Sequence, residues 1–230
     1  MEIVLHKHWK TLKLLAEDGD PEAQWEVGYL YEFGAKDKYG HVLTASDIGA
    51  AMMWYQASAS QGNRHAQNAL SRILSSAGEV ECDFPLAIHL AKKAIAQGDW
   101  SAAFNLATIY RDLKKPKLAF RWYQRAAAMG DVDAFFQIGL CYLFGFGTKQ
   151  DFDAAQSSFK RILNEDSNTS CQRSKENAQY WISIICLILG PRTNRSVVRI
   201  RSMLENANAD NDHEQANELL KLIGRSCCPG

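Results

Sequence analysis

The sequence predicts an all-α protein, a right-handed α/α superhelical solenoid built from about twelve helices stacked as antiparallel pairs. Three observations lead to this fold class. A short string of the form Gly-Asp-x-x-Ala returns along the chain, and small and large residues alternate in register around each copy. In addition, 5 prolines and 15 glycines in 230 residues leave little room for collagen-like or disordered structure.

The repeated string occurs as GDPEA, GNRHA, GDWSA and GDVDA, beginning at Gly19, Gly62, Gly98 and Gly130, with weaker copies in SKENA and DHEQA. Its final residue defines an anchor in each repeat: Ala23, Ala66, Ala102, Ala134, Ala178 and Ala216. Successive anchors are 32 to 44 residues apart, which is the period of a helical-repeat array. We therefore expect residues 1–230 to form a single array whose repeats are degenerate from about residue 165.

Each string also has a local structural meaning. Its glycine ends one helix in a left-handed conformation, and the following Asp or Asn caps the next helix. Pro21 suits the first position of that helix, where its missing N–H costs nothing. The array is expected to begin with a helix at residues 2–17 and to end with one at about residues 212–223. Within the first repeat, the loop at residues 35–46 is expanded.

Small residues mark the positions where helices should cross. Five residues after the first five anchors stand Gly28, Ser71, Ala107, Gly139 and Ser183, and only Lys221 in the last repeat breaks the series. Three residues further on stand Tyr31, Leu74, Tyr110, Tyr142 and Cys186. The small side chains allow a neighbouring helix to approach, and the larger ones fill the same face. The preceding helices pair Ala51, Ala87 and Ala119 with Trp54, Leu90 and Trp122 in the same way.

The segments AQWEVGYLYEFG, AMMWYQASASQGN, AFRWYQRAAAMGD and AFFQIGLCYLFGFG resemble Sel1-like repeats, which are relatives of tetratricopeptide repeats. The resemblance covers Gly19 to Phe159 and fades after Asn164. It implies a non-enzymatic adaptor or scaffold, often bacterial, whose first helix in each repeat lines a concave groove.

Several classes of function are disfavoured by composition. The 26 basic and 26 acidic residues argue against broad nucleic-acid binding. The longest apolar run, residues 181–189, is too short to cross a membrane, and the N-terminus has no secretory h-region. The histidines show no metal-ligand spacing and FGFGTKQD lacks a phosphate-loop pattern, so no metal or cofactor is expected. We expect a cytoplasmic monomer with reduced cysteines and no membrane partner.

Paired carboxylates keep a hydrolase open as an alternative. Asp131 with Asp133, and Asp151 with Asp153, have the residue types of an acid/base pair. Each pair also opens a helix, where capping and the helix dipole already favour acidic residues. The capping interpretation is the simpler one.

A partner-binding groove is indicated by the position two residues after each anchor, which holds Trp25, Asn68, Phe104, Phe136, Tyr180 and Glu218. At 100° per residue this position lies roughly 135° from the packing face, so intra-repeat packing does not account for its aromatic residues. The alternative is contact with the next repeat. The predicted groove residues are Trp25, Tyr29, Glu32, Arg72, Phe104, Arg111, Phe136 and Tyr180.

The leading hypothesis is therefore a module that binds a protein or peptide in its concave groove, as an adaptor, scaffold or regulator. A more specific alternative is an immunity protein that neutralises a cognate toxin, which predicts one tight partner. The third alternative is the hydrolase with acidic residues in the groove.

Overall fold

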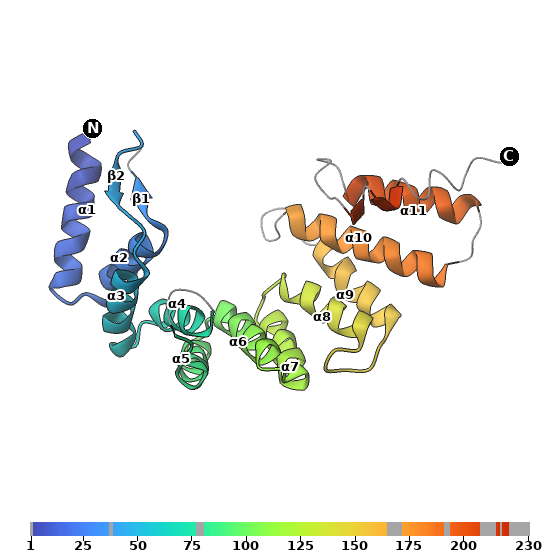
Figure 1. Cartoon of the computed structure of the whole chain (residues 1–230), viewed down its shortest axis with the longest axis horizontal. Coiled ribbons are helices and arrows are strands. Elements are labelled where there is room, and N and C mark those ends of the chain that lie inside the picture. The colour runs from blue at the N-terminus through green and yellow to red at the C-terminus, as the bar shows by residue number, and fades with distance from the viewer. Residues whose placement is uncertain are drawn as a thin grey trace. The chain divides into compact units, whose positions relative to one another are not determined.

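The computed structural model describes residues 2–36, 39–76, 81–164, 172–190, 194–207, 215–216 and 218–220. Within these residues the protein forms eleven defined helices and one two-stranded hairpin (Figure 1). Contacts between Cα atoms divide the chain into two compact units, Met1–Leu113 and Lys114–Gly230.

The first unit contains six helices and the hairpin. The elements in chain order are α1 (Glu2–Glu17), α2 (Pro21–Phe33), β1 (Ala35–Lys36), β2 (Val42–Thr44), α3 (Ile48–Ser60), α4 (Arg64–Ser75), α5 (Phe84–Ala96) and α6 (Trp100–Asp112). Each helix packs on the next one along the chain, and α4 also contacts α6. The unit is therefore a stack of antiparallel helix pairs, as the sequence predicts.

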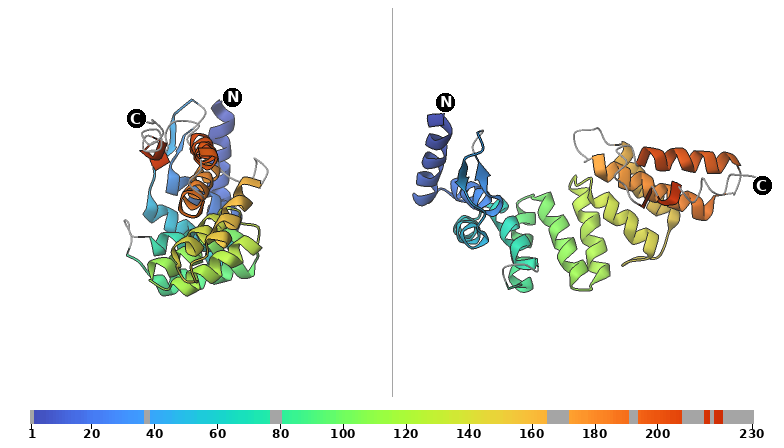
Figure 2. Two further views of the ribbon diagram at one scale, coloured as in Figure 1. Left: turned by 90° about the vertical axis from the view of Figure 1, so that its right-hand side faces the viewer. Right: turned by 45° about the horizontal axis from the view of Figure 1, so that its top comes forward.

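The second unit repeats this plan with five described helices. They are α7 (Pro116–Ala128), α8 (Ala134–Phe144), α9 (Phe152–Asn164), α10 (Gln172–Leu189) and α11 (Asn194–Ala207). Successive helices again pack together, and α10 lies beside α11 (Figure 2). Its core is built around Phe159, Ile162 and Ile185, which are almost completely buried.

The predicted hinges are confirmed in all four strong repeats. Gly19, Gly62, Gly98 and Gly130 have φ angles of 98°, 94°, 85° and 105°. Asp20, Asn63 and Asp99 cap the next helix, and a side-chain oxygen of each accepts the backbone N–H of the anchor alanine at 2.7, 3.0 and 3.1 Å. Asp131 accepts the N–H of Ala134 in the same way at 3.1 Å, from two residues before the N-cap position of α8. Glycine fits the first position because other residues pay for a positive φ.

The predicted crossing points are also confirmed. A Cβ on Gly28 would lie 2.8 Å from the ring of Tyr55, so only glycine lets α3 approach α2 this closely. Ser71, Ala107 and Ser183 are fully buried. The Ser71 hydroxyl donates to the carbonyl of Ala87 at 2.8 Å, which joins α4 to α5. Small side chains thus mark close helix contacts.

Two features differ from the predictions or go beyond them. The expanded loop after α2 forms a short hairpin, in which Ala35 pairs with Thr44 and Lys36 with Val42, so the all-α fold carries one two-stranded hairpin among the described residues. Of the expected last helix, residues 215–216 and 218–220 are helical, and its other residues lie outside the described part of the chain. A single array over residues 1–230 stays a prediction, because the contacts define two units.

Candidate functional site

Three aromatic residues form a stripe along one side of α2. Trp25, Tyr29 and Phe33 follow each other at four-residue spacing, which places them on the same helix face. The ring centroids are 6.5 Å apart for Trp25 and Tyr29, and 4.8 Å apart for Tyr29 and Phe33. Tyr29 is 50% exposed and Phe33 is 60% exposed. We call these three residues the aromatic stripe.

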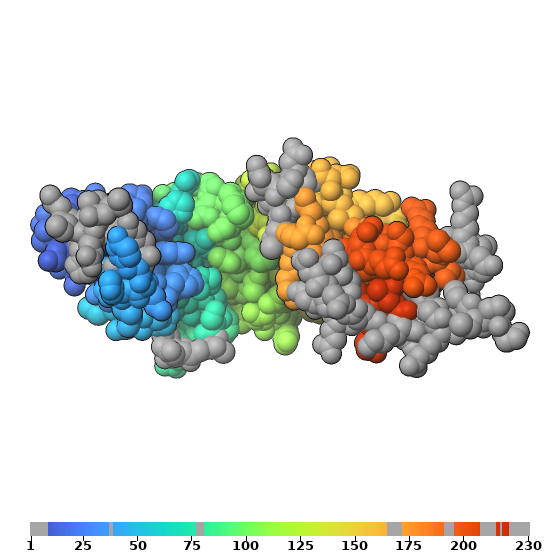
Figure 3. All heavy atoms as spheres, turned by 90° about the horizontal axis from the view of Figure 1, so that it is seen from above, coloured from blue at the N-terminus to red at the C-terminus, as the bar shows by residue number. Residues whose placement is uncertain are grey.

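A cavity of about 370 Å³ lies beside the stripe, and we call it the α2 pocket. One wall is α2, with Trp25, Glu26, Tyr29 and Leu30. The other walls come from α1 and the hairpin, and they are formed by Trp9, Leu12, Ala35, Lys36 and Leu43. In Figure 3 the light-blue atoms of the hairpin lie beside the darker blue atoms of the first helices. The pocket is therefore mostly apolar, with one acidic and one basic residue in its lining.

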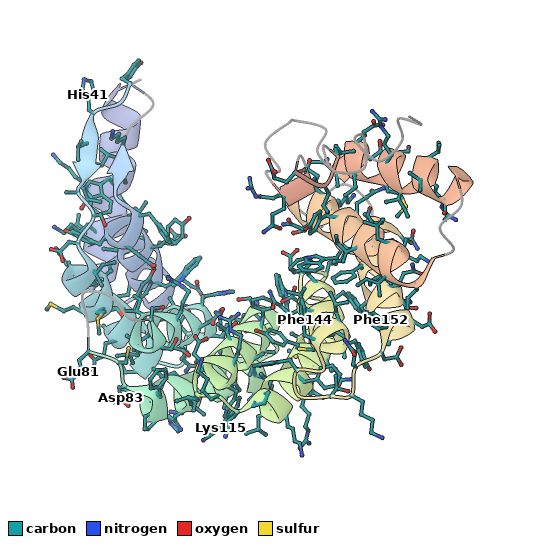
Figure 4. All side chains as sticks on the ribbon, turned by 45° about the vertical axis from the view of Figure 1, so that its right-hand side comes forward. His41, Glu81, Asp83, Lys115, Phe144 and Phe152 are labelled. Carbon is teal, nitrogen blue, oxygen red and sulfur yellow. The ribbon has the colours of Figure 1, made fainter. Side chains whose placement is uncertain are left out.

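The hairpin is held against the end of α2 by backbone geometry and polar contacts. Gly34 has φ 71°, which turns the chain out of the helix. On the return, the Ser46 hydroxyl donates to the carbonyl of Glu32 and the backbone N–H of Asp47 donates to the carbonyl of Tyr31, both at 2.7 Å. His41 lies at the outer end of the hairpin (Figure 4). These bonds fix one wall of the α2 pocket.

Trp25 also contacts the next repeat. Its ring lies 5.0 Å from the imidazole of His65 on α4, measured between centroids. The Nδ1 atom of His65 lies 3.9 Å from Oδ2 of Asp99, the buried cap of α6. Trp25 therefore makes the contact with the next repeat that the alternative interpretation expects, and it also lines the α2 pocket. That it binds a partner stays a prediction.

Glu32 and Arg72, both predicted groove residues, form an ion pair that connects helices. Glu32 is only 7% exposed, and its carboxylate binds the Arg72 guanidinium on α4 and accepts the Tyr55 hydroxyl of α3 at 2.8 Å. Burial, followed by this hydrogen bond, raises the pKa of Tyr55, which keeps the phenol protonated as a donor. These contacts join α2, α3 and α4. Glu32 therefore has a structural role, because it holds together the helices on which the aromatic stripe stands.

The other predicted residues of the first unit lie on α6. Phe104 is partly buried, whereas Arg111 is exposed and pairs with Asp112 at 3.1 Å. On α4, Asn68 occupies the position equivalent to Trp25. Its amide donates to Ser101 at 2.6 Å and accepts from Asn105 at 2.7 Å, both on α6. In α4 this position therefore serves the contact between repeats.

In the second unit, Phe136 and Tyr180 are partly buried. The Phe136 ring lies 5.7 Å from Phe159 of α9, and Tyr180 lies 5.4 Å from Trp181. Intra-repeat packing thus does account for Phe136, contrary to the angular argument. The reason is the size of Phe159, which covers Gly139 and reaches the residue one turn earlier. Burial raises the pKa of Tyr180.

Phe144 at the end of α8 (Figure 4) is an exposed aromatic residue of this unit, and its ring packs edge-on against Trp181 at 5.6 Å between centroids. It shows that aromatic surface is not confined to α2.

Sequence reasoning missed Phe33 and most of the pocket lining. Phe33 could have been found, because it continues the four-residue spacing of Trp25 and Tyr29. Glu26, Lys36 and Leu43 gave no such signal, because they come together only when the hairpin folds against α1 and α2.

Three of the four paired carboxylates accept hydrogen bonds at helix ends or between helices. Asp131 and Asp151 accept the backbone N–H of Ala134 and Ala154 at 3.1 and 2.9 Å, and Asp133 accepts the Ser174 hydroxyl at 2.8 Å. Burial is the main cause that raises the pKa of Asp131. Among the described residues, no three His, Cys, Asp or Glu side chains gather as metal ligands. In the same part of the chain, no helix combines the length and apolar character that a membrane span needs.

Comparison with known proteins finds relatives that match along most of this chain and relatives that match only a short segment of it. The chain is 26% identical over 206 residues to the Sel1-repeat-containing protein YjcO of Escherichia coli K12, a match that covers 75% of this chain and 86% of YjcO. It is 32% identical over 81 residues to the ERAD-associated E3 ubiquitin-protein ligase component HRD3 of Candida glabrata, a match that covers 35% of this chain. The matched segments span only 10% of HRD3 and 10% of a Sel1-like repeat-containing protein of Schizosaccharomyces pombe.

A solved structure has the same fold over nearly the whole chain. It is the crystal structure of c5321, a protective antigen of uropathogenic Escherichia coli strains that displays an SLR fold. The TM-score is 0.75 at 26% identity, and the match covers 96% of this chain and 44% of c5321. The Sel1 repeat family model matches four consecutive segments, residues 21–63, 64–99, 100–131 and 132–157. The chain therefore belongs to the Sel1 repeat family.

Proposed function

We propose that this chain is a protein-binding module that receives a partner protein or peptide on the aromatic stripe of α2. Sel1 repeat proteins generally mediate protein–protein interactions, and HRD3 is by its name a component of a ubiquitin ligase. The observation that carries the proposal is the exposure of Tyr29 and Phe33 beside the α2 pocket. Exposed aromatic side chains next to a preformed cavity are typical of the anchor sites that supply most of the binding energy at interfaces.

Contacts within the protein hold Trp25 and the helices that carry the aromatic stripe in place. Trp25 is held by His65, and the Glu32–Arg72 ion pair with the Tyr55 hydroxyl joins the three helices beneath the stripe. A preorganised surface loses less side-chain entropy when a partner binds. The proposal includes Phe104 and Arg111 on α6 as further contacts, and Phe136 and Tyr180 as contacts in the second unit.

The test compares two surfaces of the same unit. Tyr29→Ala combined with Phe33→Ala removes the exposed part of the stripe. Met53→Ala on α3 is the control, because Met53 is 75% exposed and belongs neither to the stripe nor to the α2 pocket. Each tagged chain is used to capture proteins from the native cells, and captured proteins are quantified by mass spectrometry. We expect the double variant to lose its specific partner at least about tenfold, as hot-spot residues do, and the control to retain it.

Equal capture by the double variant and the wild-type chain would contradict the proposal. Circular dichroism melting curves show whether both variants stay folded. The number of partners also separates the two binding roles: an immunity protein has one tight partner, whereas an adaptor has two or more of modest affinity.

A further inference from the structure

We infer that the α2 pocket binds a bulky apolar or aromatic group that carries a positive charge, as on a partner segment with an aromatic anchor next to a basic residue. The inference rests on the proposed function and specifies the chemistry of the partner. It depends on the volume of the pocket, on its aromatic walls and on the acidic side chain in its lining.

The pocket has the dimensions and lining of a small binding site. Its volume of about 370 Å³ falls within the range of roughly 300–1,000 Å³ that is usual for ligand cavities. Trp9, Trp25 and Tyr29 contribute aromatic surface from two helices, and Leu12 and Leu30 complete the apolar wall. A large planar side chain can therefore enter and make contact on several sides.

Acidic charge is available at the α2 wall. Glu26 lines the pocket, is exposed, and forms no ion pair with any described residue. Glu22 lies one helical turn earlier and is also exposed. A cation placed over aromatic faces is attracted by the ring quadrupoles, and a nearby carboxylate adds to that attraction. Both effects favour a cationic group over an anionic one.

Two basic residues at the beginning and end of α4 are engaged elsewhere. Arg72 pairs with buried Glu32, and Arg64 donates to the carbonyl of Gln97 at 3.2 Å. Lys36 is the basic residue of the pocket lining, and it comes from the hairpin. Its methylene stem can cover apolar surface while its ammonium group stays in water. Glu26 and the aromatic walls therefore set the charge preference of the pocket.

The experiment uses three probes that share one ring and differ in charge: 5-fluorotryptamine, 5-fluoroindole and 5-fluoroindole-3-propionate. Their binding to the full chain is followed by ¹⁹F NMR titration at neutral pH and low salt. We expect saturable binding, with 5-fluorotryptamine at least about threefold tighter than the propionate, as an exposed ion pair allows. Glu26→Gln should abolish this difference, and the matched control Glu22→Gln should preserve most of it.

Three results would overturn the inference: no saturable binding of any probe, equal or tighter binding of the propionate, or an unchanged preference in Glu26→Gln. Because the probes need no partner protein, these results are independent of the capture experiment. If the stripe variant loses its partner while the probes do not bind, the inference fails and the proposed function stands. If the probes bind as expected while capture is unchanged, the proposed function fails.

Discussion

The ring of Phe159 occupies the space that a side chain would need at Gly139. A Cβ atom on Gly139 would lie 2.5 Å from Cε1 of Phe159, which is closer than any normal contact. Gly139 is buried in α8 and Phe159 is completely buried in α9, so neither residue can move away easily. This one contact illustrates how the helix pairs interlock.

Gly139→Ala should therefore destabilise the protein, although alanine is the better helix former. The overpacking cost of about 1–3 kcal/mol should exceed the gain of about 1 kcal/mol in helix propensity. Urea unfolding followed by circular dichroism measures the net change. An unchanged or higher free energy of unfolding would show that α9 does not cross α8 at this glycine.

The hinge between α1 and α2 makes a second prediction. Asp20 accepts the backbone N–H of Ala23 at 2.7 Å, and Asn63 makes the same contact in the next repeat. Asp20→Ala should lower the free energy of unfolding by about 1 kcal/mol, whereas Asp20→Asn should change it much less, because both Asp and Asn are good caps. The two variants are compared by urea titration at pH 7. Equal losses would mean that the negative charge matters more than the cap.

A third prediction concerns the polar contact beneath the stripe. Tyr55→Phe removes the hydroxyl that donates to buried Glu32 and leaves the ring over Gly28 in place. The carboxylate then loses one of its partners in a site of low exposure, and we expect a loss of about 1–3 kcal/mol in the free energy of unfolding. Chemical denaturation at neutral pH provides the measurement. A loss below about 0.5 kcal/mol would contradict the role of this hydroxyl.

The pH dependence of stability gives a fourth prediction. Burial raises the pKa of Asp131 in the folded protein above its unfolded value. Between these two pKa values the folded state binds more protons than the unfolded state, so this residue makes stability fall as the pH rises above about 4. Asp131→Asn keeps a capping side chain and removes the effect. Relative to the wild type, the variant should gain stability between about pH 4 and pH 7, as measured by urea unfolding. If the difference in free energy of unfolding between the variant and the wild type stayed constant over this pH range, the assigned effect of Asp131 would be contradicted.

The sequence allowed the repeat architecture to be predicted in detail because its signals are local. The left-handed glycines, the caps and the small residues at Gly28 and Gly139 each act within one helix or one hinge. The packing of Phe136 was not foreseen because its surroundings depend on the size of a residue in another helix, Phe159. Helix geometry alone gives a direction and does not say how far a neighbour reaches.

The candidate site was predicted only in part for the same reason. Trp25 and Tyr29 were identified from their positions in the repeat, whereas the α2 pocket also needs Trp9 and the hairpin residues Lys36 and Leu43. These residues come from three separate elements, and the expanded loop carried no signal that it would form strands. The placement of Glu32 in a buried ion pair likewise depends on Arg72, forty positions along the chain.

The most direct test of the central claim is photo-crosslinking in the native cells, with p-benzoylphenylalanine replacing Tyr29 in one strain and Met53 in another. Both positions are exposed and lie in the same unit. If the aromatic stripe is the binding surface, position 29 should give a discrete covalent adduct with a partner protein, and position 53 should not. Adducts at position 53 alone, or none at position 29, would contradict the proposed function.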